Sequence, residues 1–149
     1  MYKNANLKLL GWIVGTIVVL LLLLLLMKPV EKYYLENHKD YSSYELDFNG
    51  ENLLSLLAKA PVLEEVPNED ETDAMFTFDP TFFDAYVPED VQVINVTSNS
   101  KYIIVQYYKG NDFVMLGYEN NKLTELLIQN EAKGLVTNIY NGEVTVSDL

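Results

Sequence analysis

The chain has 149 residues, of which 49% are hydrophobic, and its 22 acidic residues outnumber ten basic ones, all of them Lys. The formal net charge of −12 disfavours contact with nucleic acid or anionic lipid head groups. Because the chain has no Cys, it cannot form disulfides, thiolate metal sites or thiol nucleophiles. Because it has no Arg, it cannot form bidentate guanidinium clamps on phosphates. We therefore expect no nucleic-acid partner.

Residues 9–27 form one apolar segment, in which Thr16 is the only polar side chain. At ~1.5 Å per residue, a helix of this length measures about 28 Å, close to the ~30 Å hydrocarbon core of a bilayer. No small-x-small cleavage site follows the segment. We predict an uncleaved signal anchor: a tail over 1–8 and a single transmembrane helix over 9–27 that contacts the lipid bilayer.

The orientation of this segment depends on its flanking charges. Lys3 and Lys8 precede it, and Lys28 and Lys32 follow it, so the positive-inside rule is nearly balanced. A short N-terminal tail is easily retained, and acidic residues hardly oppose translocation. We predict a cytoplasmic N-terminus and an extracytoplasmic C-terminal domain at the cell membrane.

Two further features accompany the anchor. Gly11 and Gly15 form a G-x-x-x-G pair, a pattern typical of membrane helices that pack closely, so homodimerisation through this face is one alternative. Pro29 should interrupt a helix that arrives from the membrane. We expect residues 28–40 to form a separate short helical stalk below the domain.

Residues 41–149 are predicted to form one acidic α+β domain. Tyr44 to Phe48 alternate between apolar and acidic side chains, which predicts a first strand. Asn49 is the expected N-cap of a short helix that follows. The apolar face of this helix, spaced to pack on a sheet, comprises Leu53, Leu56, Leu57 and Ala60.

The stretch 64–73 is the most polar part of the chain and is predicted to be a flexible acidic loop. Its oxygen-bearing side chains suit Ca²⁺ but lack the Gly and the distal Glu of an EF-hand loop. A solvated loop and a weak divalent-cation site therefore stay open as alternatives. The candidate ligands are Glu69, Asp70, Glu71 and Asp73.

Strand patterns separated by turn residues fill the rest of the chain. Phe82 and Phe83 are expected in a connecting helical turn, and Asn141-Gly142 is a strong hairpin signal. The predicted strands are 75–78, 91–97, 102–108, 113–118, 136–140 and 144–146; the stretch 123–128 fits a strand or a short helix. Short turns between successive strands predict an antiparallel meander with one packing helix.

The sequence offers little catalytic chemistry. His38 is the only imidazole and lies in the predicted stalk, and no G-x-S-x-G, S-x-x-K or H-E-x-x-H motif occurs. Asp79, Asp84, Glu89 and Asp90 adjoin aromatic residues, so a small carboxylate-dependent hydrolase is one alternative. We predict a non-enzymatic protein with no catalytic residue and no cofactor.

Five tyrosines on the predicted strands are candidates for a partner surface. Tyr is enriched at protein interfaces, but it also fills small β-sheet cores, so both interpretations stay open. They are Tyr102, Tyr107, Tyr108, Tyr118 and Tyr140. The anchor and these tyrosines together predict a cell-envelope module that binds or regulates a protein partner, with a divalent-cation-responsive protein as the alternative.

In its layout the chain resembles small, uncharacterised single-pass proteins of low-GC Gram-positive bacteria. The resemblance rests on the Lys-bearing tail, the apolar segment 9–27 and the Lys- and Tyr-rich, Arg-free composition of the domain. It carries over no functional residue. It implies a cell-envelope setting for a bacterial protein.

Overall fold

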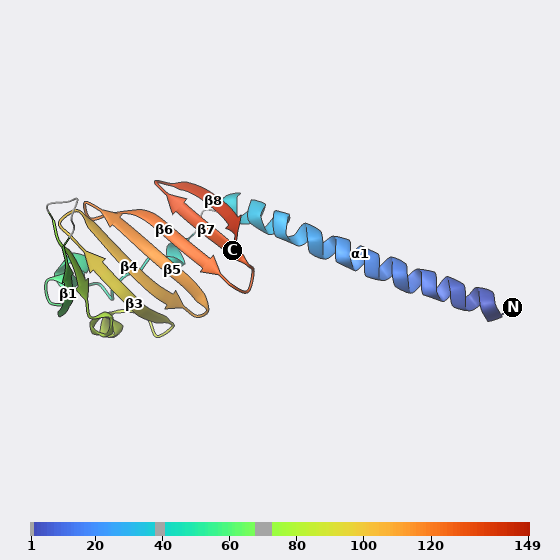
Figure 1. Ribbon diagram of the computed structural model, residues 1–149, viewed down its shortest axis with the longest axis horizontal. Coiled ribbons are helices and arrows are strands. Elements are labelled where there is room, and N and C mark those ends of the chain that lie inside the picture. Colours follow the sequence, from blue (N-terminus) through green and yellow to red (C-terminus); the bar gives the residue numbers. More distant parts are fainter. Residues whose placement is uncertain (1, 38–40, 68–72) are drawn as a thin grey trace. The chain divides into compact units, whose positions relative to one another are not determined.

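The computed structural model describes residues 2–37, 41–67 and 73–149, which divide into a helical unit and a sheet domain. The first unit is helix α1, Tyr2–Asn37 (Figure 1). Its segment Asn6–Glu36 reaches a mean hydropathy of 3.0 and is the one helix of the described residues that is long and apolar enough to cross a membrane. None of its most apolar window is buried, so α1 is not a core helix of the domain.

Helix α1 runs through Pro29, so the expected interruption at this residue is wrong. Pro29 lacks the N–H that would bond to the carbonyl of Leu25, but the turns on either side keep their own bonds. The described part of the predicted stalk is therefore the C-terminal end of the same helix, up to Asn37. His38 lies outside the described residues.

The domain is built on one antiparallel sheet whose eight strands lie side by side in chain order (Figure 1). The strands are β1 (Val62–Val66), β2 (Met75–Phe78), β3 (Val91–Ser98), β4 (Tyr102–Lys109), β5 (Asp112–Glu119), β6 (Lys122–Asn130), β7 (Leu135–Tyr140) and β8 (Glu143–Asp148). The predicted α+β meander is confirmed. The stretch 123–128, for which strand and helix were both open, lies in β6.

Tight turns explain why successive strands pair with each other. Asn141 (φ 48°) and Gly142 (φ 85°) join β7 to β8 in the left-handed backbone region that two-residue hairpin loops need. Asn120 (φ 49°) and Asn121 (φ 64°) do the same between β5 and β6. Asn tolerates this region better than most other residues with a side chain, because its short side-chain amide can form hydrogen bonds with the nearby backbone.

Three short helices and the chain between them cover one face of the sheet: η1 (Ser42–Tyr44), α2 (Leu53–Leu57) and η2 (Pro80–Tyr86). The predicted strand at 44–48 is wrong. Its alternation is nevertheless real, because Phe48 is buried and Tyr44 and Leu46 are half-buried against the core. The alternation therefore marks which side chains face the core, while the backbone crosses the sheet face instead of joining an edge.

Helix α2 packs with the predicted face. Leu56 is fully buried, Ala60 just after the helix is nearly so, and Leu53 and Leu57 pack against the core. Its N-cap is Asn52, whose side chain accepts a hydrogen bond from the Leu54 N–H at 2.9 Å; the expectation of Asn49 is wrong.

The predicted acidic loop 64–73 is partly wrong, because its first residues belong to strand β1. β1 pairs with β2 at the edge of the sheet, and all five of its side chains are exposed. An edge strand can keep Glu64 and Glu65 in water while its backbone is paired, so acidic side chains do not exclude a strand here. Residues 68–72 lie outside the described part of the chain.

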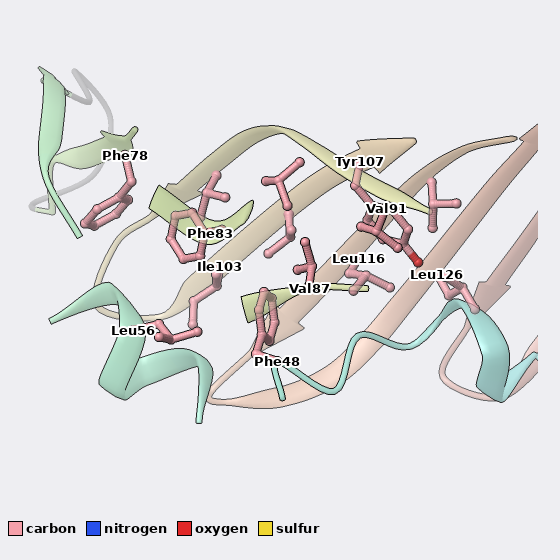
Figure 2. Close-up of a cluster of buried hydrophobic side chains, with 14 of the residues drawn as sticks. Phe48, Leu56, Phe78, Phe83, Val87, Val91, Ile103, Tyr107, Leu116 and Leu126 are labelled. Carbon is pink, nitrogen blue, oxygen red and sulfur yellow. The ribbon is translucent and has the colours of Figure 1, made fainter. Parts of the chain in front are cut away.

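The hydrophobic core lies between the sheet and the short helices (Figure 2). Phe48 and Phe83 meet edge to face with ring centroids 6.3 Å apart, and Phe82 meets Phe83 at 5.4 Å. These side chains pack on one face of the sheet, which we call the covered face. It is formed by Phe78, Val91, Val93, Val96, Ile103, Val105, Tyr107, Val114, Leu116, Leu126 and Ile128. The predicted helical turn at Phe82 and Phe83 is thereby confirmed as η2.

Candidate interaction surface

The strand register assigns every second residue to the face opposite the core, which we call the open face. Figure 1 shows the sheet with no described segment of the domain laid across this side. Its positions on the central strands are Gln92, Asn95 and Thr97; Tyr102, Ile104, Gln106 and Tyr108; Phe113, Met115, Gly117 and Glu119; Lys122, Glu125, Leu127 and Gln129; and Val136, Asn138 and Tyr140.

Two adjacent rows across the open face contain no charged residue. One row runs through Asn95, Gln106, Met115, Leu127, Asn138 and Thr145, and the next through Gln92, Tyr108, Phe113, Gln129, Val136 and Ser147. Met115, Leu127 and Phe113 are half-buried by their neighbours. Apolar side chains at the centre, with amides and hydroxyls around them, give this part of the sheet the composition of a protein interface.

The open face is partly ordered by its own polar groups. The Asn95 side-chain amide donates to the Gln106 side-chain oxygen across the strand pair at 3.1 Å. The side-chain oxygen of Asn138 is buried and has no hydrogen-bond partner within the described residues. Buried polar atoms are usually paired, so Asn138, which lies on β7 beside Leu127, is an unsatisfied group of this surface.

The five candidate tyrosines divide between the two faces of the sheet. Tyr107 is fully buried on the covered face, where its hydroxyl donates to the Tyr44 carbonyl oxygen. Tyr118 lies on the same face, paired across the strands with Ile103. For these two positions the structure therefore agrees with the core interpretation.

The other three candidates lie on the open face. Tyr108 is 41% exposed and meets Phe113 edge to face, with ring centroids 5.8 Å apart. Tyr140 is 55% exposed, and Tyr102 is half-buried. The structure thus brings together three of the five tyrosines on one uncovered surface.

Burial raises the pKa of three tyrosines in and around the core, two on the covered face and one in the segment that packs on it. Desolvation raises the pKa of Tyr118 to about 12, and the negative charge of Glu45 adds to it. Desolvation raises the pKa of Tyr44 to about 12 as well, together with the hydrogen bond that its hydroxyl donates to Asp112 at 2.8 Å. The pKa of Tyr107 is raised further, chiefly by burial. These hydroxyls stay neutral and structural at ordinary pH.

Acidic residues gather at one end of the open face. Glu125 lies between Gly117 and Tyr140 in the row next to the uncharged ones, and Glu119 lies one step further out. Lys101 forms an ion pair with Glu119 at 3.4 Å and lies 4.8 Å from the centroid of the Tyr102 ring. Tyr102, and then Glu119, raise the pKa of the Lys101 amine.

The predicted cation ligands are mostly outside the described residues. Glu69, Asp70 and Glu71 fall in 68–72, and of the candidates only Asp73 is described. Asp73 accepts a hydrogen bond from the Ser100 hydroxyl. Among the described residues, no group of three or more His, Asp or Glu is placed to hold a metal ion. The cation site stays a prediction.

Of the carboxylates considered for a hydrolase, Asp79 has a local structural role. Asp79 caps η2 by accepting hydrogen bonds from the Thr81 N–H at 3.0 Å and the Thr81 hydroxyl at 2.7 Å. Gly11 and Gly15 leave a shallow apolar groove along α1, and a Cβ on either would meet nothing within 4 Å. Dimerisation through this groove stays a prediction.

Sequence reasoning missed most of the open face. Ile104, Gln106, Met115, Leu127 and Glu125 sit at alternate strand positions, but no local signal separates them from the alternate set that is buried. The missing information was the pairing register between the strands. The register shows that the outward residues of five strands lie side by side and form one surface.

The chain matches no protein-family model, no curated protein and no solved structure with which it was compared.

Proposed function

We propose that the protein is a membrane-anchored, non-enzymatic module of the cell envelope that binds a protein partner through the open face. The observation that carries this proposal is the uncovered sheet face with two uncharged, partly apolar rows and three tyrosines. The N-terminus lies in the cytoplasm and the sheet domain outside it.

Helix α1 supports the anchoring part of the proposal. Every side chain from Asn6 to Met27 is exposed, including an unbroken run of leucines at 20–26. Burying such a surface in lipid stabilises it by about 25 cal/mol per Å² of apolar area, whereas water would leave all of it hydrated. A bilayer would bury this surface.

The open face supports the binding part. Half-buried Met115, Leu127 and Phe113 expose apolar surface that a partner can dehydrate. Tyr108 and Tyr140 stand at its margin with rings in reach of solvent. Tyr combines a large apolar ring with a polar hydroxyl, and such residues contribute strongly to protein interfaces.

Charge determines the chemistry of the partner. From Lys28 onward the chain carries eight Lys and 22 acidic residues, a net charge of −14. An acidic partner would be repelled at long range, and a basic one attracted. The partner is therefore an envelope protein with an apolar strip flanked by Lys or Arg.

Site-specific photo-crosslinking in the native cells tests this proposal. A photoreactive amino acid at Met115 should give a crosslink to one membrane or envelope protein, whereas the same group at Glu131, exposed in the β6–β7 turn, should not. Leu127→Asp in the Met115 variant should abolish the crosslink, because it places a charge on the apolar surface.

The partner so identified must also bind the purified full-length chain in detergent, and less tightly after Leu127→Asp. Equal crosslinking from Met115 and Glu131, or a crosslink unaffected by Leu127→Asp, would refute the proposed surface. The sheet signal in circular dichroism confirms that each variant is folded.

A further inference from the structure

The open face is hollowed at its acidic end. A hollow of about 320 Å³ is lined there by Tyr102, Ile104, Gly117, Glu119, Glu125 and Tyr140, among others. Gly117, in the middle of β5, is part of this lining and carries no side chain. The Glu125 side chain lies over that gap, with its Cβ 3.1 Å and its Oε2 3.5 Å from where a Cβ of residue 117 would stand.

The lining combines two chemical types in one small space. Glu119 and Glu125 supply carboxylates, while Tyr102 and Tyr140 supply aromatic rings beside the half-buried Ile104. Carboxylates attract a cation, and ring faces attract it too. The apolar surface of Ile104 suits the hydrocarbon stem on which Lys and Arg carry their charge.

An ammonium group of the chain itself already contacts two of the residues that line this hollow. The Lys101 Nζ contacts the Tyr102 ring at 4.8 Å and the Glu119 carboxylate at 3.4 Å. On the other side, Glu125 and Tyr140 are adjacent across β6 and β7. Within the described residues Glu125 takes part in no ion pair. The second half of the hollow therefore has the same chemistry without an ammonium of its own.

We infer that this hollow binds a cationic side chain, Lys or Arg, of the partner protein, between Glu125 and Tyr140. The inference rests on the proposed function, since it names the group that docks beside the uncharged rows. A bare divalent cation suits the hollow less, because Ca²⁺ needs six to eight oxygen ligands and two sides of the hollow are apolar or aromatic.

Nuclear magnetic resonance of the full-length chain in detergent, with labelled tyrosine rings, tests the cation site directly. N-acetyl-lysine N-methylamide should shift the ring signals of Tyr102 and Tyr140 until they saturate, and leave those of buried Tyr107 unchanged. The neutral norleucine analogue should shift none of them. Absence of a saturable shift with the lysine and arginine analogues would overturn the inference, as would displacement of either analogue by equimolar Ca²⁺.

Two variants locate the site. Glu125→Gln should weaken binding of the lysine analogue by about fivefold or more, since it removes a charge-assisted contact. Glu131→Gln, an exposed change outside the hollow, is the matched control and should have no effect. Gly117→Ala fills the hollow and displaces Glu125, so it should also weaken binding in a chain that remains folded. Equal effects of Glu125→Gln and Glu131→Gln would overturn the inference.

The crosslink from Met115 separates this inference from the proposed function. Glu125→Gln should lower the crosslink yield, and Glu131→Gln should not. An unchanged yield with Glu125→Gln would overturn the inference that the hollow recognises the partner, but it would leave the proposed partner surface intact. If the lysine analogue binds but Met115 gives no crosslink, the proposed function is refuted, while binding of a cation in the hollow is supported.

Discussion

Tyr107 joins the sheet to the segment that covers it. Its ring is fully buried on β4, and its hydroxyl donates to the carbonyl oxygen of Tyr44 in η1. Lys109, two residues further along the same strand, donates to the Ser43 carbonyl and lies 5.5 Å from the centroid of the Tyr44 ring. The covering segment is thus held by polar contacts from β4 as well as by apolar packing.

Replacing this hydroxyl tests the contact. Tyr107→Phe should lower the free energy of unfolding by about 1–3 kcal/mol, because it leaves the Tyr44 carbonyl without its donor. Tyr140→Phe removes a hydroxyl from a 55% exposed side chain and should change that free energy by less than about 0.5 kcal/mol. Denaturant unfolding of the full chain in detergent, followed by the sheet signal, measures both. Equal losses would show that the contact does not stabilise the fold.

From Tyr44 and Tyr118 we also predict how the stability of the domain changes at alkaline pH. Their pKa values are raised in the folded state, to about 12 for Tyr44 and Tyr118, against about 10 in an unfolded chain. Their contribution to stability is therefore complete below pH ~10 and is lost as the pH rises toward 12. Denaturant unfolding at a series of pH values should show the free energy of unfolding falling in this window.

Phenolate absorbance identifies the groups responsible. Tyr118→Phe should remove a late-titrating phenol and flatten the loss of stability above pH ~10. The exposed Tyr140→Phe is the control and should leave the late titration intact. A domain whose stability is independent of pH between 10 and 12 would contradict the expectation.

At the scale of elements, the short helix α2 closes the core at one end of the covered face. Figure 2 shows Leu56 directed from α2 toward Ile103 of β4. Leu56 is fully buried, whereas Leu54 on the same helix is 43% exposed. The helix has only the residues Leu53–Leu57, so its stability comes from this packing and not from its own hydrogen bonds.

Truncation of these two leucines tests the role of α2. Leu56→Ala should cost about 2–5 kcal/mol of unfolding free energy, because it leaves a cavity against the sheet. Leu54→Ala should cost less than about 1 kcal/mol. Thermal or denaturant unfolding distinguishes them, and similar losses would mean that α2 is not part of the cooperative core.

At the scale of the whole molecule, α1 and the sheet domain differ in how much of their apolar surface is exposed. The domain buries its apolar side chains on its covered face, while α1 exposes all of its side chains from Asn6 to Met27. An apolar helix of this length is long enough to cross a membrane, and this holds independently of the fold of the domain. The proposed anchor can therefore be separated from the fold of the domain.

Cell fractionation tests the anchor and its direction. The full-length chain should stay with membranes after alkaline extraction, and deletion of residues 1–27 should move it to the soluble fraction. Protease added to intact protoplasts should digest the domain of the full-length protein. Survival of the domain until the cells are lysed would reverse the proposed orientation, and a soluble full-length chain would refute the anchor.

The sequence alone determined the features that depend on neighbouring residues. The apolar run at 9–27 predicts a spanning helix from its length and composition, and the turns Asn120-Asn121 and Asn141-Gly142 have backbone angles that join adjacent strands. The local sequence pattern predicted the wrong secondary structure where contacts with distant parts of the chain determine it. Residues 44–48 alternate like a strand but cross the sheet face, and acidic β1 is a strand because β2 pairs with its backbone.

Only the tertiary structure decided which side of each strand is covered and which side belongs to the open face. In β4, Ile103, Val105 and Tyr107 alternate with Ile104, Gln106 and Tyr108, and the two sets differ little in apolar character. The first set is buried because the segment 41–60 and η2 pack on that side. A period of two defines two faces, but it does not say which one is covered, since covering depends on residues distant in the chain.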